Sequence, residues 1–319
     1  MKILRSFIPL VMLVALLAGA LPSMAPAASA GAPTLNRSPP LIINHRGASG
    51  YLPEETLEAY RLAVAMQAEF LECDVYISKD GVPVLLHDGT LNATTNVVAY
   101  AAVHPDIYIL GRDVDTTRTY DVTEFTFAQL QALTATCRNA FGYCTDRSHF
   151  DPTRHYRIIS LVQLADFVHE LYVTTGRIVG LYPETKQEGD AVADMILAVL
   201  QDPKYGGLFD GSKHNVILQS FDARQLRHLR GRTKLPLVQL GICPGDVAAA
   251  QAIEAYADGV GPPTGKTDSA CVAAAHAAGL FVHPYTFLND PSQYATYFAM
   301  GVDGVFSNFA DMARKVRDR

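Results

Sequence analysis

The sequence predicts an α/β fold, a TIM (β/α)8 barrel with a cap subdomain inserted after a hairpin on its second strand. From residue 161 onward, short apolar stretches typical of strands alternate with amphipathic stretches typical of helices. Residues 41–74 form a strand, helix and strand, which implies a parallel pair joined by a right-handed crossover. Counted together, the parallel strands number about eight, as a TIM barrel requires.

Each element rests on its own pattern. In the first helix, Leu57, Tyr60 and Val64 recur at helical spacing, and Gly176 and Gly279 mark two later helix ends. The predicted barrel strands are residues 41–44, 70–78, 177–182, 215–218, 235–240, 258–261, 280–282 and 302–306. The predicted helices are residues 54–68, 161–173, 190–200, 223–230, 247–256, 270–278 and 291–300.

The second strand continues into a hairpin. An Asp-Gly pair at 80–81 between two extended stretches is a strong hairpin signal. If the turn centres on that pair, His87 lies opposite Asp74, about 5 Å away. Because side chains alternate along a strand, Glu72 and Asp74 share a face, and Cys73 points the other way.

Residues 89–155 follow the hairpin and show only weak periodicity, apart from one short helix expected at 127–133. So long a stretch within a compact domain usually forms a lid or small subdomain, so we expect a cap insertion within the barrel domain of residues 41–319. A solvated excursion is the alternative. Residues 31–40 are rich in Pro and Ser and are expected to be a linker.

Residues 1–30 have the pattern of a signal peptide. Lys2 and Arg5 precede an apolar run at 7–21, and an Ala-x-Ala cleavage site ends at residue 30. The run is short for a spanning helix, so no stable membrane insertion is expected, although an uncleaved anchor is the alternative. We therefore expect a secreted or periplasmic protein.

The chain carries a formal net charge of −6, and loss of Lys2 and Arg5 would make it more acidic. An acidic chain argues against nucleic acid or an anionic membrane surface as a main partner. A small-molecule substrate is expected instead, and protein partners are left open.

Export makes disulfides possible. Cys137 and Cys144 flank a loop-like spacer and are expected to pair. Cys243 and Cys271 lie in barrel connections and are expected to form a second disulfide, with two free buried thiols as the alternative. Cys73 would then remain free.

Five short motifs stand in order between residues 45 and 88. They are His45-Arg46-Gly47-Ala48-Ser49-Gly50, Pro53-Glu54-Glu55-Thr56, Glu72-Cys73-Asp74, Lys79-Asp80-Gly81 and His87-Asp88. This set resembles the motifs of the glycerophosphodiester phosphodiesterase family. The resemblance implies a TIM barrel, a divalent metal, and hydrolysis of glycerophosphodiesters to glycerol 3-phosphate and an alcohol.

Three carboxylates are candidate metal ligands: Glu72, Asp74 and Glu184. Converging at one barrel mouth, they would repel each other unless a cation lay among them. Oxygen ligands favour one hard ion, Ca²⁺ or Mg²⁺. In the alternative, Glu184 pairs with Lys186 and the other two are solvated.

His45 and His87 are the candidate acid and base, because imidazole titrates near neutral pH. A histidine at a strand end is often only a satisfied core residue, but here both lie in matching motifs beside carboxylates. Arg46 is expected to bind phosphate oxygens bidentately and to act in catalysis. Lys186, which matches the last position of the family's Glu-x-Lys motif, is expected to add a second positive charge.

Gln219, Phe221 and Tyr285 are candidate substrate-binding residues at the rim, with simple packing as the alternative. His283, also at a strand end, is expected to be structural. Two places depart from the family. Tyr285-Thr286 replaces a tryptophan-threonine pair, and the last strand ends at Ser307-Asn308, where the family more often has Thr-Asp. Both leave the headgroup preference open.

Two other functions are considered. One is a phospholipase of the sphingomyelinase D or phosphatidylinositol phospholipase C type, which acts on intact lipid and needs an apolar rim. The intact Pro53–Thr56 motif favours the diesterase. The other is a non-enzymatic binding protein, against which the full set of histidines and carboxylates argues.

Overall fold

The computed structural model describes residues 32–319, which lie within one compact unit. The predicted signal peptide, residues 1–30, lies outside the described residues. Within the described part, no helix combines the length and apolar character needed to cross a membrane. Residues 32–40, the described part of the predicted linker 31–40, form hydrogen bonds with the barrel domain. Ala32 N–H donates to the Ala299 carbonyl, and Leu35 N–H donates to the Asp303 carboxylate.

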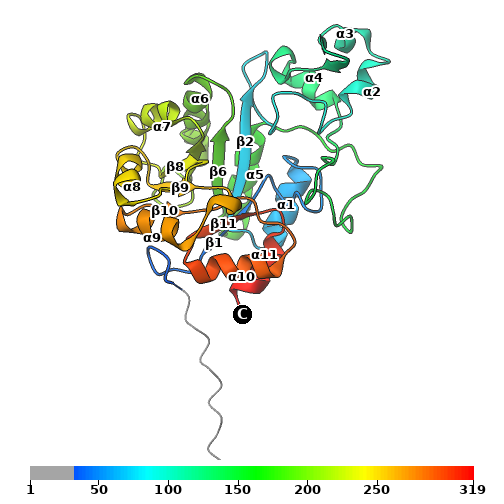
Figure 1. Cartoon of the computed structure of the whole chain (residues 1–319). Coiled ribbons are helices and arrows are strands. Elements are labelled where there is room, and N and C mark those ends of the chain that lie inside the picture. The colour runs from blue at the N-terminus through cyan, green and yellow to red at the C-terminus, as the bar shows by residue number, and fades with distance from the viewer. Residues whose placement is uncertain (1–31) are drawn as a thin grey trace, which may run out of the picture. The chain divides into compact units, whose positions relative to one another are not determined.

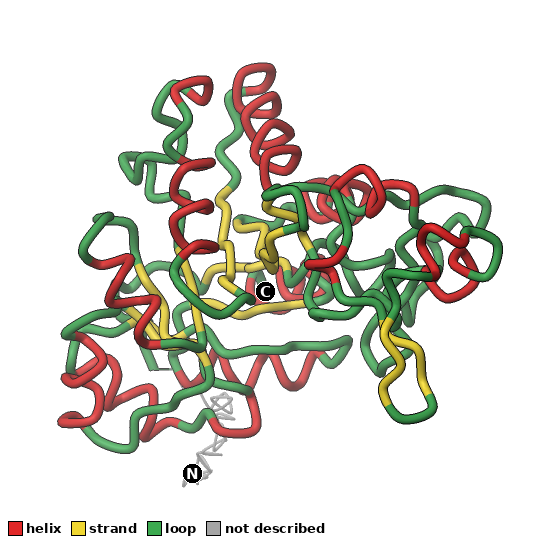
Figure 2. The backbone as a smooth tube through the Cα atoms, turned by 90° about the horizontal axis from the view of Figure 1, so that it is seen from above, coloured by secondary structure: helices red, strands yellow, loops and turns green. Residues whose placement is uncertain are grey.

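Eight parallel strands form a nearly closed barrel, so the predicted TIM-type fold is confirmed (Figures 1 and 2). In barrel order the strands are β1 (Leu41–Asn44), β2 (Phe70–Ile77), β6 (Gly180–Thr185), β7 (Leu218–Ser220), β8 (Leu237–Leu240), β9 (Gly259–Gly261), β10 (Phe281–Val282) and β11 (Gly304–Ser307). β1 pairs with both β2 and β11. The remaining seam, between β10 and β11, is bridged by backbone bonds such as Asp303 N–H to Val282.

Helices surround the strands, as the view down the barrel in Figure 2 shows. They are α1 (Leu57–Ala65), α5 (Leu161–Thr175), α6 (Ala191–Leu200), α7 (Ala223–Arg230), α8 (Val247–Glu254), α9 (Ser269–Ala277), α10 (Pro291–Met300) and α11 (Ala310–Arg317). Alternate strand residues divide into two cores. One set packs against the helices, and the other fills the barrel interior with side chains that include Ile43, Tyr182, Val238 and Phe306.

Most element boundaries agree with the sequence prediction within a few residues, with two clear exceptions. The third barrel strand was expected to end at Tyr182, just before Pro183, a residue type that cannot donate to a ladder. It runs through Pro183 to Thr185, and its pairing with β7 is sparse. Helix α11 was not predicted at all, although its first turn buries Ala310 and Ala313.

The expected hairpin register is wrong by one residue. β2 pairs with β3 (Pro83–Leu85) through Val75–Leu85 and Tyr76–Val84, which places Leu86, not His87, opposite Asp74. The reason is the loop length: Ser78 N–H donates to Val82, so the loop has three residues and not two. β3 ends at Leu85, and His87 reaches the barrel mouth from the segment that follows.

Residues 89–155 contain more structure than the one helix predicted. The elements are α2 (Val97–Ala101), α3 (Pro105–Tyr108), β4 (Arg112–Val114), β5 (Thr117–Thr119) and α4 (Phe127–Ala132), and α4 matches the prediction. Leu91, Val97, Phe125 and Leu130 pack with β3 residues into a separate small core. In Figure 1 these helices gather beyond the far end of β2.

Both predicted disulfides are present, Cys137–Cys144 and Cys243–Cys271, with Cα–Cα distances of 5.8 Å and 5.6 Å. Cys73 is the one free cysteine within residues 32–319, and it is buried. Its side chain packs on the helix side of β2, opposite to Glu72 and Asp74, as the alternation predicted.

His283 lies inside the barrel, among the side chains of its interior core. Its Nδ1 is 3.2 Å from the hydroxyl of Tyr182, and its ring packs on Phe281 and Phe306. Burial lowers the pKa of His283 from 6.5 to about 4. The ring is therefore neutral at neutral pH, in agreement with the structural role expected for it.

This burial predicts a pH dependence of stability. Because the folded-state pKa of His283 lies below its unfolded value, the unfolded chain binds the extra proton as pH falls, and stability is lost below about pH 6.5. We expect His283 to account for roughly 2 kcal/mol of the loss between about pH 7.5 and pH 5. Urea unfolding of wild type and His283→Gln at both pH values measures it. Equal losses in the two proteins would contradict the prediction.

Candidate active site

A cavity of about 110 Å³ opens at the carboxyl ends of the barrel strands. Nine of the ten candidate residues line it: His45, Arg46, Glu72, His87, Glu184, Lys186, Gln219, Phe221 and Tyr285. The tenth, Asp74, contacts Arg46 and Lys186 of that lining. The residues come from β2, β6, β7 and the segments that follow the strands, so the barrel brings together side chains that are far apart in sequence.

The carboxylates are buried and are bordered by two cations. Asp74 and Glu72 are each only 1% exposed. Arg46 Nε lies 3.0 Å from Asp74, and Lys186 Nζ lies 3.1 Å from Glu184 and 3.7 Å from Asp74. The alternative noted above is thus half met: Glu184 does pair with Lys186, but the other two carboxylates are not solvated.

Burial and mutual repulsion raise the pKa values of two carboxylates, whereas the neighbouring cations lower that of the third. Burial and the charge of Asp74 raise the pKa of Glu72 well above its ordinary value and that of Glu184 to about 8. Burial acts the same way on Asp74, but Arg46 and Lys186 outweigh it and lower the pKa of Asp74. The cluster therefore holds more negative charge than its two cations stabilise, and a further cation would favour full ionisation.

Glu55 is a fourth buried carboxylate, which the sequence analysis did not single out. One oxygen each of Glu55, Glu72 and Asp74 lie within 4.8 Å of one another. The oxygens of Glu55 already have partners, because they accept hydrogen bonds from the Asp74 N–H and the Tyr60 hydroxyl. Glu55 does not line the cavity, whereas Glu184 does. We conclude that Glu55 lies outside the cavity lining and holds the backbone of Asp74 through this hydrogen bond.

Buried oxygen atoms of this cluster fit a hard cation. Both carboxylate oxygens of Asp74 and the Oε1 of Gln219 are buried and accept no hydrogen bond, although Arg46 Nε forms an ion pair with one Asp74 oxygen at 3.0 Å. Buried oxygens normally accept hydrogen bonds, and all three are of the type that Ca²⁺ and Mg²⁺ prefer. The buried acidic group can thus hold a divalent ion, with Glu72 and Asp74 at its centre.

The turn that carries Arg46 is set by local sequence. Arg46 has φ = +58° and Gly47 has φ = +78°, and a Cβ on Gly47 would lie 2.7 Å from the Cβ of Ala59. Only glycine fits there without strain. The turn directs the backbone N–H of Arg46 to Glu72 at 2.8 Å, so the same motif positions both the Arg46 guanidinium and the Glu72 carboxylate.

Asn308 fixes the ring of His45. The Oδ1 of Asn308 lies 2.7 Å from His45 Nδ1, while its Nδ2 donates to the carbonyl of Gly142 at 2.9 Å. Because the amide nitrogen is committed to Gly142, Oδ1 must accept from His45, which places the ring proton on Nδ1. Burial and the neighbouring Arg46 lower the pKa of His45. His45 is therefore a neutral imidazole with a free Nε2.

Asp88 fixes the ring of His87 in a similar way. Its carboxylate lies 2.6 Å from His87 Nδ1, and Arg138 Nη1 donates to its other oxygen at 2.8 Å. The hydrogen bond from His87 and the nearby Arg138 hold the pKa of Asp88 below its ordinary value. Nε2 is therefore the ring nitrogen of His87 that is left for a substrate.

The three predicted rim residues differ in position. Gln219 is 1% exposed and donates to Glu72 Oε1 at 3.1 Å, so it lies in the floor of the cavity and not at the rim. Phe221 is 52% exposed, and its ring lies 6.1 Å from that of Tyr285. These two aromatic side chains form an apolar edge on one side of the opening.

Sequence reasoning missed several partners of the proposed catalytic groups. Glu54, Glu55 and Asp88 stood in the quoted motifs without a role, and Asn308 was noted only as a departure. Arg138 had no signal of its own beyond its place between two cysteines expected to pair.

Comparison with known proteins shows the family of this chain. The profile of the glycerophosphoryl diester phosphodiesterase family matches residues 45–312, which span most of the chain. The chain belongs to this family. A glycerophosphodiester phosphodiesterase of Haemophilus influenzae is 32% identical over 93% of this chain and 94% of its own length. Its Bacillus subtilis counterpart is 29% identical over 87% of this chain and 86% of its own.

Solved structures of the phosphodiesterase family share the fold. A phosphodiesterase of Oleispira antarctica, in complex with the product sn-glycerol-3-phosphate, has a TM-score of 0.66 at 21% identity, over 90% of this chain and all of that one. A glycerophosphodiester phosphodiesterase of Agrobacterium tumefaciens gives 0.60 at 20% identity, over 86% and 99% of the two chains. At this identity the likeness establishes the barrel alone.

Proposed function

We propose that this phosphodiesterase-family protein hydrolyses small, water-soluble glycerophosphodiesters to glycerol 3-phosphate and an alcohol, with one divalent cation and two histidines. One observation carries the proposal: His45, His87, the three carboxylates, Arg46 and Lys186 meet at a single cavity. Family membership and the product bound by the Oleispira antarctica relative support it.

The cation, Ca²⁺ or Mg²⁺, would be held by Glu72, Asp74 and Glu184. When bound, it would offset the negative charge that grows on the phosphoryl oxygens during attack. The Asp74 oxygens, which are buried and accept no hydrogen bond, support this assignment. Glu55 would not be a ligand. It would keep Asp74 in place by accepting a hydrogen bond from the backbone N–H of Asp74.

The different roles proposed for Glu184 and Glu55 give a prediction. Glu184→Gln should weaken Ca²⁺ or Mg²⁺ binding by more than tenfold, because it removes a ligand charge, which corresponds to about 1.4 kcal/mol or more. Glu55→Gln is the matched control, because Gln can still accept the Asp74 N–H. Isothermal titration calorimetry of both variants measures the affinities. A larger loss in Glu55→Gln would exchange the two roles.

Positive side chains would bind the phosphodiester. Arg46 and Lys186 lie on the carboxylate side of the cavity, where they would bind the phosphoryl oxygens and stabilise developing charge. Phe221 and Tyr285 would contact the glycerol or the leaving group, and Gln219 would orient Glu72.

Proton transfer follows from the two ring environments. His45 is neutral with a free Nε2 and suits the general base, which removes a proton from the attacking hydroxyl. His87, with Nδ1 against Asp88, suits the acid that protonates the leaving alkoxide. The attacking group is either water or the 2-hydroxyl of the glycerol moiety, and in the second case a cyclic phosphate forms and water then opens it.

A direct test compares soluble diesters with lipids. Glycerophosphocholine and glycerophosphoethanolamine should be hydrolysed, whereas vesicles of phosphatidylcholine, sphingomyelin or phosphatidylinositol should not. The small volume of the cavity, about 110 Å³, favours the soluble substrates. Faster turnover of any intact lipid would replace the proposal by the phospholipase alternative.

We also propose that the protein is exported after cleavage at residue 30. The two disulfides support an oxidising compartment. N-terminal sequencing of the protein recovered from periplasm or medium tests it, and a retained Met1 would argue against cleavage.

A further inference from the structure

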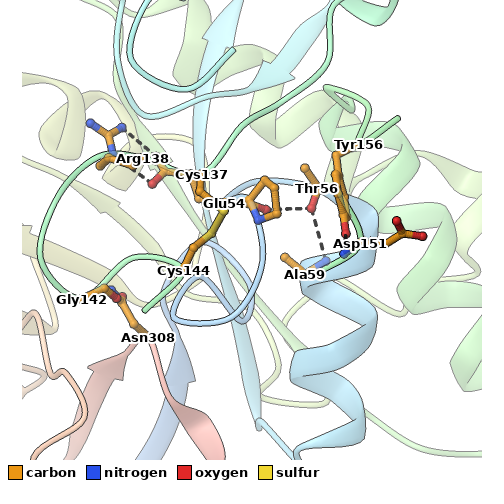
Figure 3. The surroundings of a disulfide bond; sticks show 11 residues. Glu54, Thr56, Ala59, Cys137, Arg138, Gly142, Cys144, Asp151, Tyr156 and Asn308 are labelled. Atoms are coloured by element: carbon orange, nitrogen blue, oxygen red, sulfur yellow. Dashed lines mark hydrogen bonds and ion pairs between the residues drawn. A yellow bond between two sulfur atoms is a disulfide. The ribbon is translucent and has the colours of Figure 1, made fainter. Parts of the chain in front are cut away.

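We propose that the disulfide-closed loop Cys137–Cys144 is a positioning element that holds the partners of both catalytic histidines at once. The inference rests on the proposed function and extends it to residues outside the barrel. The loop belongs to the 89–155 insertion, yet two separate chains of contacts lead from it to the two histidines. Figure 3 shows where they begin, with Arg138 beside Glu54 and Gly142 beside Asn308.

The first chain leads to His45. The Gly142 carbonyl accepts from Asn308 Nδ2, which leaves Asn308 Oδ1 to accept from His45 Nδ1. Without the carbonyl of Gly142, the amide of Asn308 could rotate by half a turn and present its NH₂ group to His45. That orientation would favour the other ring tautomer, with the proton on Nε2, which cannot accept a proton from a nucleophile. The loop thus selects the reactive tautomer.

The second chain leads to His87. Arg138 donates to Glu54 through Nε at 2.9 Å and Nη2 at 2.7 Å, and to Asp88 through Nη1 at 2.8 Å. Figure 3 shows the paired contact of Arg138 with Glu54 beside the disulfide. The bidentate pair anchors the guanidinium, because such forks are both strong and directional. The third bond then holds the Asp88 carboxylate against His87 Nδ1.

The disulfide joins the two chains. Arg138 follows Cys137 directly, and Gly142 precedes Cys144 by two residues, so one covalent link restrains both contacts. The loop is also fixed to the barrel, since Cys144 N–H donates to the Ser49 carbonyl, and Ser49 Oγ donates to the His45 carbonyl. The ring of Tyr143, in the same loop, lies 5.5 Å from the Arg46 guanidinium and 5.6 Å from the Arg138 guanidinium.

The chain supplies its own control for the test. Cys137→Ser/Cys144→Ser opens the loop, while Cys243→Ser/Cys271→Ser removes a disulfide whose cysteines do not line the cavity. With glycerophosphocholine, we expect the first variant to lose about 10- to 100-fold in kcat, because small displacements of catalytic groups have effects of this size. KM should change much less. The control should keep wild-type kcat. A loop variant that is folded by circular dichroism and has unchanged kcat would overturn the proposal.

A mutant cycle with Asn308→Ala tests the first chain. If the loop acts on His45 through Asn308, the losses in kcat of the two variants combined should be less than additive. Additive losses would show that the loop acts by another route. Arg138→Met tests the second chain with the same kcat readout. It replaces the cysteine variant if that variant fails to fold, and normal kcat in Arg138→Met would then overturn the proposal.

A spectroscopic readout separates this inference from the proposed function. In ¹⁵N-histidine NMR spectra, His45 should show the Nδ1–H tautomer, assigned by its absence in His45→Gln. Opening the loop should convert it to a mixture. If the wild-type protein fails to hydrolyse glycerophosphocholine but this change occurs, the proposed function fails and the positioning role stands. An unchanged tautomer in the opened loop contradicts the positioning role, whatever the activity.

Discussion

His45→Ala and His87→Ala should each lower kcat by roughly 10²- to 10⁴-fold, the usual contribution of a general acid or base. Both rings line the cavity, and each has its Nδ1 engaged by a side chain, Asn308 or Asp88, that leaves Nε2 for the substrate. Steady-state kinetics with glycerophosphocholine measures the loss. The two losses should combine less than additively if the histidines act as a unit. Cation affinity should change little, because neither ring is a proposed ligand.

The leaving group assigns the two roles. In a nitrophenyl ester of glycerol 3-phosphate, the nitrophenolate leaves without needing a proton. This substrate should therefore restore much of the activity of His87→Ala and leave His45→Ala impaired. The reverse pattern would exchange acid and base. Near-normal turnover of glycerophosphocholine in either variant would remove that histidine from the mechanism.

Removal of the divalent cation should have the second large effect. Exhaustive EDTA treatment should lower the rate by about 10²-fold or more, because charge stabilisation by a metal ion is worth several kcal/mol. Ca²⁺ or Mg²⁺ should restore it. The buried acidic group supports this expectation, since neither oxygen of Asp74 accepts a hydrogen bond and the pKa of Glu184 is raised to about 8.

Asp74→Asn should abolish the response to added cation. Asp113→Asn is a suitable control, because that carboxylate is 72% exposed and lies in the insertion. Full activity after chelation, with no metal detected by elemental analysis, would contradict the metal site.

The sequence predicted the barrel because its information is local. Alternating strands and helices, and the polar residues at strand ends, are read within short windows, and the right-handed crossover rule then assembles them. The same logic placed Glu72, Asp74 and Glu184 together, although the last is more than a hundred residues away. The boundary errors arose where one residue contradicts its surroundings, as Pro183 does inside β6.

The hairpin shows the limit of local reading. An Asp-Gly signal does not distinguish a two-residue loop from a three-residue loop, and that single residue shifts every opposing pair. His87 nevertheless reaches the cavity, because the chain leaves the ladder after Leu85.

The partners of the histidines could not be found from sequence, because they are long-range and depend on folding. Arg138 meets Glu54 across 84 positions, and Asn308 meets His45 across 263. No spacing rule links such residues. Only the expected Cys137–Cys144 disulfide pointed to that loop, and it gave no reason to connect the loop with catalysis.

Hydrolysis of glycerophosphocholine in H₂¹⁸O, followed by ³¹P NMR and mass spectrometry, tests the central claim most directly. We predict glycerol 3-phosphate that carries one ¹⁸O on phosphorus, together with unlabelled choline, formed only when Ca²⁺ or Mg²⁺ is present. Phosphocholine and glycerol as products, ¹⁸O in the choline, or no turnover with any cation would contradict the account.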